Sequence, residues 1–218
     1  GMPIAGELYF MYATMLIAVP TGVKVFNWIT TMYKGSLTFE TPMLFSIAFV
    51  ILFTFGGFTG LMLSIAAADM QYHDTYFVVA HFHYVMVAGA VFSGTAAIYY
   101  WLPKWCGKMY NETMGQVQFW VAFIGFNIAF MPQHFLGLAG MPRRYADYGL
   151  QFADWNMVSS IGAFIYGGAQ IMLLYNVIMT IKFGKPTTEE KTWEGAEGLE
   201  WTVPSPAPYH TFAKPPEF

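Results

Sequence analysis

The sequence predicts an all-α integral membrane protein, a bundle of five transmembrane helices followed by a polar, extended C-terminal tail. Of its 218 residues, 56% are hydrophobic and 11% are charged, whereas soluble domains carry about 25% charged residues. The net charge of −3 provides no basic surface for nucleic acid. Cys106 is the single cysteine, so the chain forms no internal disulfide. These features indicate that lipid is the solvent of most of the chain.

Five segments are long and apolar enough to cross a membrane, which takes about 20 residues in a helix. Lys24 is the single charged residue in the first segment, and the second and third contain no Asp, Glu, Lys or Arg. Strands are excluded because an isolated helix satisfies its own backbone hydrogen bonds in lipid and an open strand does not. The predicted spans are residues 8–32, 42–68, 75–102, 115–138 and 155–181.

The spans define a transmembrane part, residues 1–183, and a tail, residues 184–218, that is polar and rich in proline. The tail is expected to cover other surfaces with little regular structure of its own. Lysines gather at one set of helix ends, which by the positive-inside rule face the cytoplasm or the matrix. They are Lys34, Lys104, Lys108, Lys182 and Lys185, opposite Asp69, Asp74, Arg143, Arg144, Asp147 and Asp154. The opening GMPIAGELYF lacks an initiator Met at position 1 and a signal-peptide pattern, so we expect the chain to be part of a longer polypeptide.

Two histidines lie one residue apart in the third span, in the segment VAHFHYV. A helix turns about 100° per residue, so the side chains of His81 and His83 leave it about 200° apart. They cannot chelate one ion together, but each can bind a separate metal on its own side. The alternative is that both are packing residues bonded to neighbouring carbonyls. Because ionisable residues inside a membrane are commonly functional, the sequence favours two metal sites with one helix between them.

Further polar residues stand at the opposite end from the lysines. His73 and Asp74 combine imidazole and carboxylate, which suit a divalent cation; alternatively, Asp74 is the N-cap of the third span. Arg143 and Arg144 suit carboxylates, which arginine binds bidentately; alternatively, they reach lipid headgroups. His134 is expected to be a polar contact rather than a ligand.

Lys24 is the one charge within a predicted span. An ammonium at this depth is costly unless it is paired or loses its proton. Thr21 lies one turn before it on the same helix face, so the two can relay protons inward. The alternative is a lysine that reaches the inner surface with its long side chain.

Taken together, these segments resemble subunit I of the haem-copper oxidases, in particular that of the aa3-type cytochrome c oxidases. The matching segments extend over essentially the whole chain, and the five spans correspond to the last five of the family's twelve. Quinol oxidases usually carry Asn at the position of Asp74, so this residue favours the cytochrome c branch. The matching segments are IAVPTGVKVFNW, YHDTYFVVAHFHYV, PQHFLGLAGMPRRYADY and LEWTVPSPAPYHTF.

The resemblance implies two haem ligands on the third span. His81 would be the proximal ligand of the high-spin haem a3 at the oxygen site, and His83 an axial ligand of the low-spin haem a. Phe82 would lie between the two haems. Arg143 and Arg144 would hold the haem propionates.

The resemblance also implies metal and proton sites. His73 and Asp74 would bind Mg²⁺ or Mn²⁺ at a site shared with subunit II. Asp69 would hydrogen-bond a propionate of the oxygen-site haem, and Asp147 matches a position near the family's Ca²⁺/Na⁺ site. Thr21 and Lys24 would belong to the K proton pathway.

The implied activity is oxidation of cytochrome c with reduction of O₂ to water and proton pumping. In the family, all ligands of CuB, the tyrosine crosslinked to one of them and the second axial histidine of the low-spin haem lie upstream. The chain alone is therefore expected to be inactive. Its implied partners are the N-terminal part of subunit I, subunit II with its copper centre, subunit III, cytochrome c and membrane lipid. The alternatives are a quinol oxidase, a dihaem electron carrier without copper, and a proton channel built around Lys24.

Overall fold

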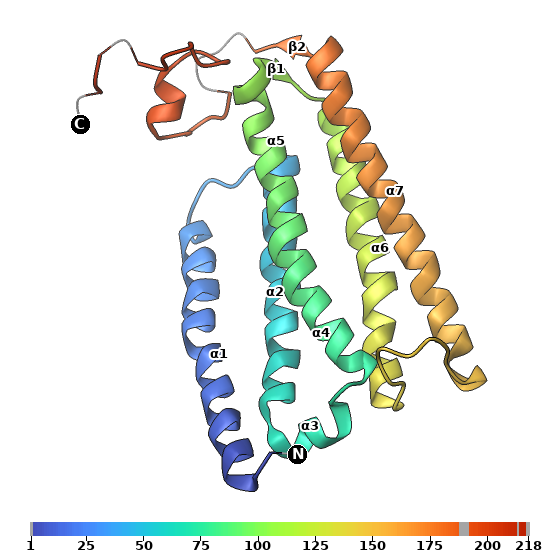
Figure 1. Ribbon diagram of the computed structural model, residues 1–218. Coiled ribbons are helices and arrows are strands. Elements are labelled where there is room, and N and C mark those ends of the chain that lie inside the picture. The colour runs from blue at the N-terminus through green and yellow to red at the C-terminus, as the bar shows by residue number, and fades with distance from the viewer. Residues whose placement is uncertain (1, 188–191, 213, 217–218) are drawn as a thin grey trace.

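The computed structural model describes residues 2–187, 192–212 and 214–216. Within these residues, five helical segments are long and apolar enough to cross a membrane, and they run side by side in alternating directions (Figure 1). The predicted all-α membrane bundle is confirmed. The helices are α1 (Ile4–Met32), α2 (Thr41–Ser64), α3 (Ala66–Tyr72), α4 (Tyr76–Met86), α5 (Ser93–Cys106), α6 (Glu112–Leu138) and α7 (Ala153–Phe183).

The second span is shorter than predicted. α2 ends at Ser64, and Ile65 takes an extended conformation with φ −77° and ψ 111°. The chain then turns into the short helix α3, which lies at one end of the bundle (Figure 1). The prediction of one helix over residues 42–68 was wrong because the apolar run continues through Ile65 to Ala68 and carries no turn residue at the break.

The third span is one continuous helical segment with a change of winding. α4 passes into a π-helix, η1 (Val87–Phe92), and then into α5. The hydroxyl of Ser93 donates to the carbonyl of Gly89 within this segment. α5 ends where Gly107 takes a left-handed conformation, φ 68°, which favours glycine. The span is therefore longer than residues 75–102, and its π-helical turn was not predicted.

α6 and α7 pack closely along their length, and glycines stand at their contact. A Cβ on Gly125 would lie 2.6 Å from the backbone nitrogen of Tyr166, and one on Gly162 would lie 2.2 Å from that of Ala129. Small residues at such positions allow backbones to pack directly in a membrane. The aromatic core is formed by side chains of α2, the third span and α6, and includes Phe45, Phe92, Tyr99, Phe119 and Phe126.

The tail is anchored rather than free over the part that the structure describes. Strand β2 (Lys185–Pro186) pairs with β1 (Lys108–Met109). This pairing joins the C-terminal ends of α5 and α7. Lys104 donates from its Nζ to the carbonyl oxygens of Val203 and Pro204, at 2.6 Å and 3.1 Å. Trp201, in the 3₁₀ turn η3 (Leu199–Thr202), is buried. The tail thus has little regular structure, as expected, but packs on the end of α5.

Candidate functional site

His81 projects from α4 toward α2, where it meets two oxygen atoms. Its Nδ1 lies 2.9 Å from the carbonyl oxygen of Gly56 and 3.1 Å from Oγ1 of Thr59. A carbonyl oxygen can only accept a hydrogen bond, so Nδ1 carries the proton. The lone pair of the imidazole is then on Nε2, which is the form that ligates a metal.

A glycine of α2 makes room for the His81 ring. A Cβ on Gly60 would lie 2.8 Å from Cε1 of His81, closer than side chains approach one another. Thr59, the residue before it, is 6% exposed and directs its hydroxyl toward His81 and Gly56. The segment GGFTG therefore forms a cradle for His81, defined here as Gly56, Thr59 and Gly60.

His83 projects toward α6 instead. Its Nδ1 lies 2.7 Å from the carbonyl oxygen of Val79, one turn earlier in the same helix, so Nδ1 again carries the proton. The ring stacks on Phe130 of α6, with 4.1 Å between ring centroids and an interplanar angle of 17°. His83 therefore also has the tautomer that leaves Nε2 available to a metal.

The donor set fits two metal centres rather than one. His81 contacts α2 and His83 contacts α6, so the two imidazoles lie on different sides of α4. Each has its proton on Nδ1, as second-shell carbonyls commonly arrange for metal-bound histidine. Phe82 lies between them in the sequence and stacks on His83, with centroids 4.6 Å apart. Each histidine can therefore offer one ring nitrogen to a metal on its own side of α4.

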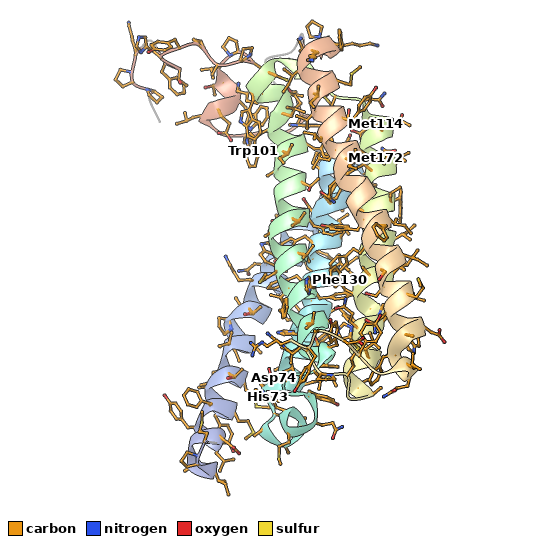
Figure 2. The ribbon with its side chains drawn as sticks, turned by 45° about the vertical axis from the view of Figure 1, so that its right-hand side comes forward. His73, Asp74, Trp101, Met114, Phe130 and Met172 are labelled. Carbon is orange, nitrogen blue, oxygen red and sulfur yellow. The ribbon has the colours of Figure 1, made fainter. Side chains whose placement is uncertain are left out.

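A polar cluster lies at the end of the bundle where α4 begins, and it brings together the residues predicted there (Figure 2). The imidazole of His73 lies 3.6 Å from a carboxylate oxygen of Asp69 and 3.4 Å from one of Asp74. Arg143 and Arg144 approach the other oxygen of Asp74 at 4.0 Å and 3.7 Å. These long, mostly exposed pairs are weak, which leaves both guanidinium groups available to other anions.

The loop after α6 is held against the start of α4 by backbone bonds. Tyr76 donates its N–H to the carbonyl of Met141 at 3.0 Å, and Arg143 donates to that of Asp74 at 2.8 Å. The N-cap of α4 is Thr75, whose hydroxyl accepts from the N–H of Phe77. The alternative that Asp74 caps this helix was wrong, because Asp74 has a left-handed φ of 52° and its carboxylate turns to the arginines.

The surroundings of Asp69 in this cluster shift the pKa of its carboxyl. Partial burial raises the pKa of its carboxyl, and the neighbouring Asp74 adds to this, whereas His73 opposes it. The guanidinium of Arg143 lies 5.7 Å from the centre of the Phe82 ring, so the cluster adjoins the region between the two histidines.

Within the described residues, no three His, Cys, Asp or Glu side chains are arranged to hold a metal ion. His73 and Asp74 therefore supply at most part of a coordination shell. Asp147 accepts a hydrogen bond from the N–H of Tyr148 and is exposed. His134 is buried among aromatic rings, with Nδ1 3.3 Å from the carbonyl oxygen of Met131, as expected of a polar contact.

The structure does not bring Lys24 and Thr21 to the histidines. Both lie on α1, which contains no buried residue and packs against α2 through Trp28. The hydroxyl of Thr21 donates to the carbonyl of Ile17 at 2.8 Å, and Lys24 is exposed. A threonine and a lysine on one face within a span are costly to expose to lipid.

These features define a polytopic membrane protein in which α4 carries one histidine on each of two sides. The chain matches the family described as "Cytochrome C and Quinol oxidase polypeptide I" over residues 1–165, and it belongs to this family. It is 51% identical over 218 residues to "Cytochrome c oxidase subunit 1" of Cereibacter sphaeroides, covering 100% of this chain and 38% of that protein.

Two further proteins are similar to this chain. The protein of the same name from Bacillus sp. (strain PS3) is 51% identical over 217 residues, covering 98% of this chain and 35% of that protein. A solved heme-copper terminal oxidase dimer, 16% identical, has the same fold, with a TM-score of 0.74 over 86% of this chain and 38% of that chain. The chain thus spans little more than a third of the length of these relatives.

The sequence motifs do not predict the surroundings of either histidine. Thr59 and Gly60 contact His81. Phe130 stacks on His83. The register between α4 and its neighbours determines these contacts, and no local signal in the sequence specifies that register.

Proposed function

We propose that this chain is part of the catalytic subunit of a cytochrome c oxidase, which reduces O₂ to water with electrons from cytochrome c and pumps protons. The observation that carries the proposal is the pair of imidazoles on different sides of α4, each with its proton on Nδ1. The identity of 51% to two proteins named cytochrome c oxidase subunit 1 supports it.

In this proposal, His81 holds the high-spin haem a3 and His83 holds the low-spin haem a. Bound haem supplies the one-electron and O₂ chemistry. The residues of this chain orient and insulate it: the α2 cradle fixes the ring of His81, and Phe130 fixes that of His83. Phe82, between the two ligands, keeps water out of the short path across α4.

The polar cluster at the start of α4 is proposed to bind the charged edges of the haems. Arg143 and Arg144 hold propionates, and Asp69 hydrogen-bonds a propionate of the oxygen-site haem. His73 and Asp74 contribute ligands to Mg²⁺ or Mn²⁺, with the remaining ligands from subunit II and water. Asp147 is proposed to lie near a Ca²⁺ or Na⁺ site.

The remaining proposals concern the parts that this chain lacks. CuB and its ligands, together with the second axial histidine of haem a, are proposed to lie in an N-terminal part of subunit I that packs against α1. Thr21 and Lys24 then form a proton pathway at that contact. Residues 184–218 lie on the cytoplasmic or matrix side, and subunit III completes the complex with subunit II.

The test is optical spectroscopy of the complex purified with this chain. Reduced-minus-oxidised spectra should show two haems per chain, and CO should shift the spectrum of one of them. Absence of a CO-reactive haem would favour the dihaem carrier and contradict the oxidase, and absence of haem would favour the channel. Oxidation of reduced cytochrome c, but not of quinol, by the same preparation would separate the two oxidase classes.

A further inference from the structure

Thr59 forms a triangle of polar atoms with His81 and Gly56 that the proposed haem ligation does not require. Thr59 Oγ1 lies 2.9 Å from the carbonyl oxygen of Gly56 and 3.1 Å from His81 Nδ1. The third side, from His81 Nδ1 to the Gly56 oxygen, is 2.9 Å. Because these three polar atoms contact one another, the position of the proton on each donor depends on the other two groups.

The proton assignment follows from the chemistry of the three groups. The Gly56 oxygen only accepts, so the O–H of Thr59 and the N–H of His81 are both donors to it. The hydroxyl proton is then committed to Gly56, so Thr59 can offer only a lone pair to His81. The N–H of His81 is therefore shared between two acceptors, a carbonyl and a hydroxyl oxygen.

We propose that Thr59 is a positioning residue that tunes the metal ligand His81 by accepting part of its Nδ1–H hydrogen bond. This inference rests on the proposed ligation of the high-spin haem by His81. A second acceptor draws the proton away from the ring and makes Nε2 a stronger electron donor, as second-shell partners of metal-bound histidine do. A stronger axial donor favours the ferric over the ferrous state and lowers the reduction potential.

His83 has no such triangle within the described residues. Its Nδ1 meets only the Val79 carbonyl of its own helix, at 2.7 Å, and its ring stacks on those of Phe82 and Phe130. The two histidines therefore differ in their second shell, and Thr59 is the side chain that makes the difference.

The experiment uses the assembled complex with Thr59→Val, which keeps the shape of the side chain and removes the hydroxyl, and Thr59→Ser, which does the reverse. We expect the iron–histidine stretch of the reduced high-spin haem, measured by resonance Raman, to shift to lower frequency in Thr59→Val and to stay in place in Thr59→Ser. The midpoint potential of the same haem should rise in Thr59→Val alone.

Thr54→Val is the matched control, because Thr54 lies on the same helix and its hydroxyl donates only to the Val50 carbonyl. It should leave both quantities unchanged, and the unchanged spectrum of the low-spin haem reports correct assembly of every variant. If Thr59→Val fails to assemble, Thr59→Cys, whose thiol is a weaker acceptor, should show a smaller shift in the same direction.

An unshifted stretch in Thr59→Val or in its Cys substitute would overturn the proposal, as would an equal shift in Thr59→Ser, which would indicate packing by the methyl group. Wild-type complex without a high-spin haem would overturn the proposed function, and this inference with it. The two failures are therefore distinguishable by the wild-type spectrum.

Discussion

The histidines on the two sides of α4 carry their proton on the same ring nitrogen, but different groups accept the hydrogen bond. On one side, the N–H of His81 is held by the Gly56 carbonyl and the Thr59 hydroxyl of the neighbouring helix α2. On the other, the N–H of His83 is held by the Val79 carbonyl of α4 itself. The orientation of His81 thus depends on how α2 packs against α4, whereas that of His83 is mostly internal to α4. Substitutions at helix contacts should distinguish the two.

The largest effect is expected from Gly137→Ala, which acts on both sides at once. A Cβ at this position of α6 would lie 1.9 Å from the backbone nitrogen of Phe77, at the start of α4. Because the obstacle is backbone, α4 must move as a whole, and overpacking of this kind costs about 1–3 kcal/mol or more. Haem content per purified chain should fall for both haems.

Gly94→Ala is the control for that substitution, since a Cβ on Gly94 of α5 would meet nothing within 4 Å. It should retain both haems. Normal haem content in Gly137→Ala would show that α4 is not held by this contact.

Gly60→Ala should disturb only the His81 side of α4. Its Cβ would lie 2.8 Å from Cε1 of His81, so the ring must tilt, at a cost of about 1–3 kcal/mol. We expect the CO-reactive haem to be reduced or altered in the CO-difference spectrum while the low-spin spectrum persists. Gly57→Ala, whose Cβ would contact nothing within 4 Å, should behave as wild type. Equal changes at both haems would refute the difference between the two sides.

Phe130→Ala should disturb the opposite side, and less severely. The stack of Phe130 on His83 adds about 0.5–1.5 kcal/mol beyond the area that it buries. Because the Val79 carbonyl still holds the ring, the low-spin band should shift and broaden without loss of the haem. Phe164→Ala, at an exposed position of α7, is the control. A change confined to the CO-reactive haem would contradict the assignment of Phe130 to His83.

The smallest effect is expected from Thr75→Val at the N-terminus of α4. The hydroxyl of Thr75 accepts from the N–H of Phe77 at 3.3 Å, and losing an N-cap costs about 0.5–2 kcal/mol. Thermal unfolding of the purified complex should begin at a slightly lower temperature, with both haem spectra unchanged. Thr31→Val, at an exposed position on α1, is the control and should leave the melting temperature unchanged. A spectral change at either haem in Thr75→Val would mean that the cap orients a histidine.

The number of spans and the different directions of the His81 and His83 side chains could be predicted from the sequence. Long uncharged runs admit only helices in lipid, and the angle between His81 and His83 follows from helix geometry alone. The break at Ile65, the π-helical turn at Val87–Phe92 and the cap at Thr75 could not be predicted, because they depend on contacts between helices. The roles of Thr59 and Phe130 depend on helix register for the same reason.

The most direct test of the claim that α4 separates two independent sites is the haem content of the assembled His83→Met complex, measured together with its CO-difference spectrum. His81 keeps its cradle on α2 in this variant, so the CO-reactive haem should remain at the wild-type amount while the low-spin spectrum changes. Equal loss of both haems in a complex that still assembles would contradict the claim.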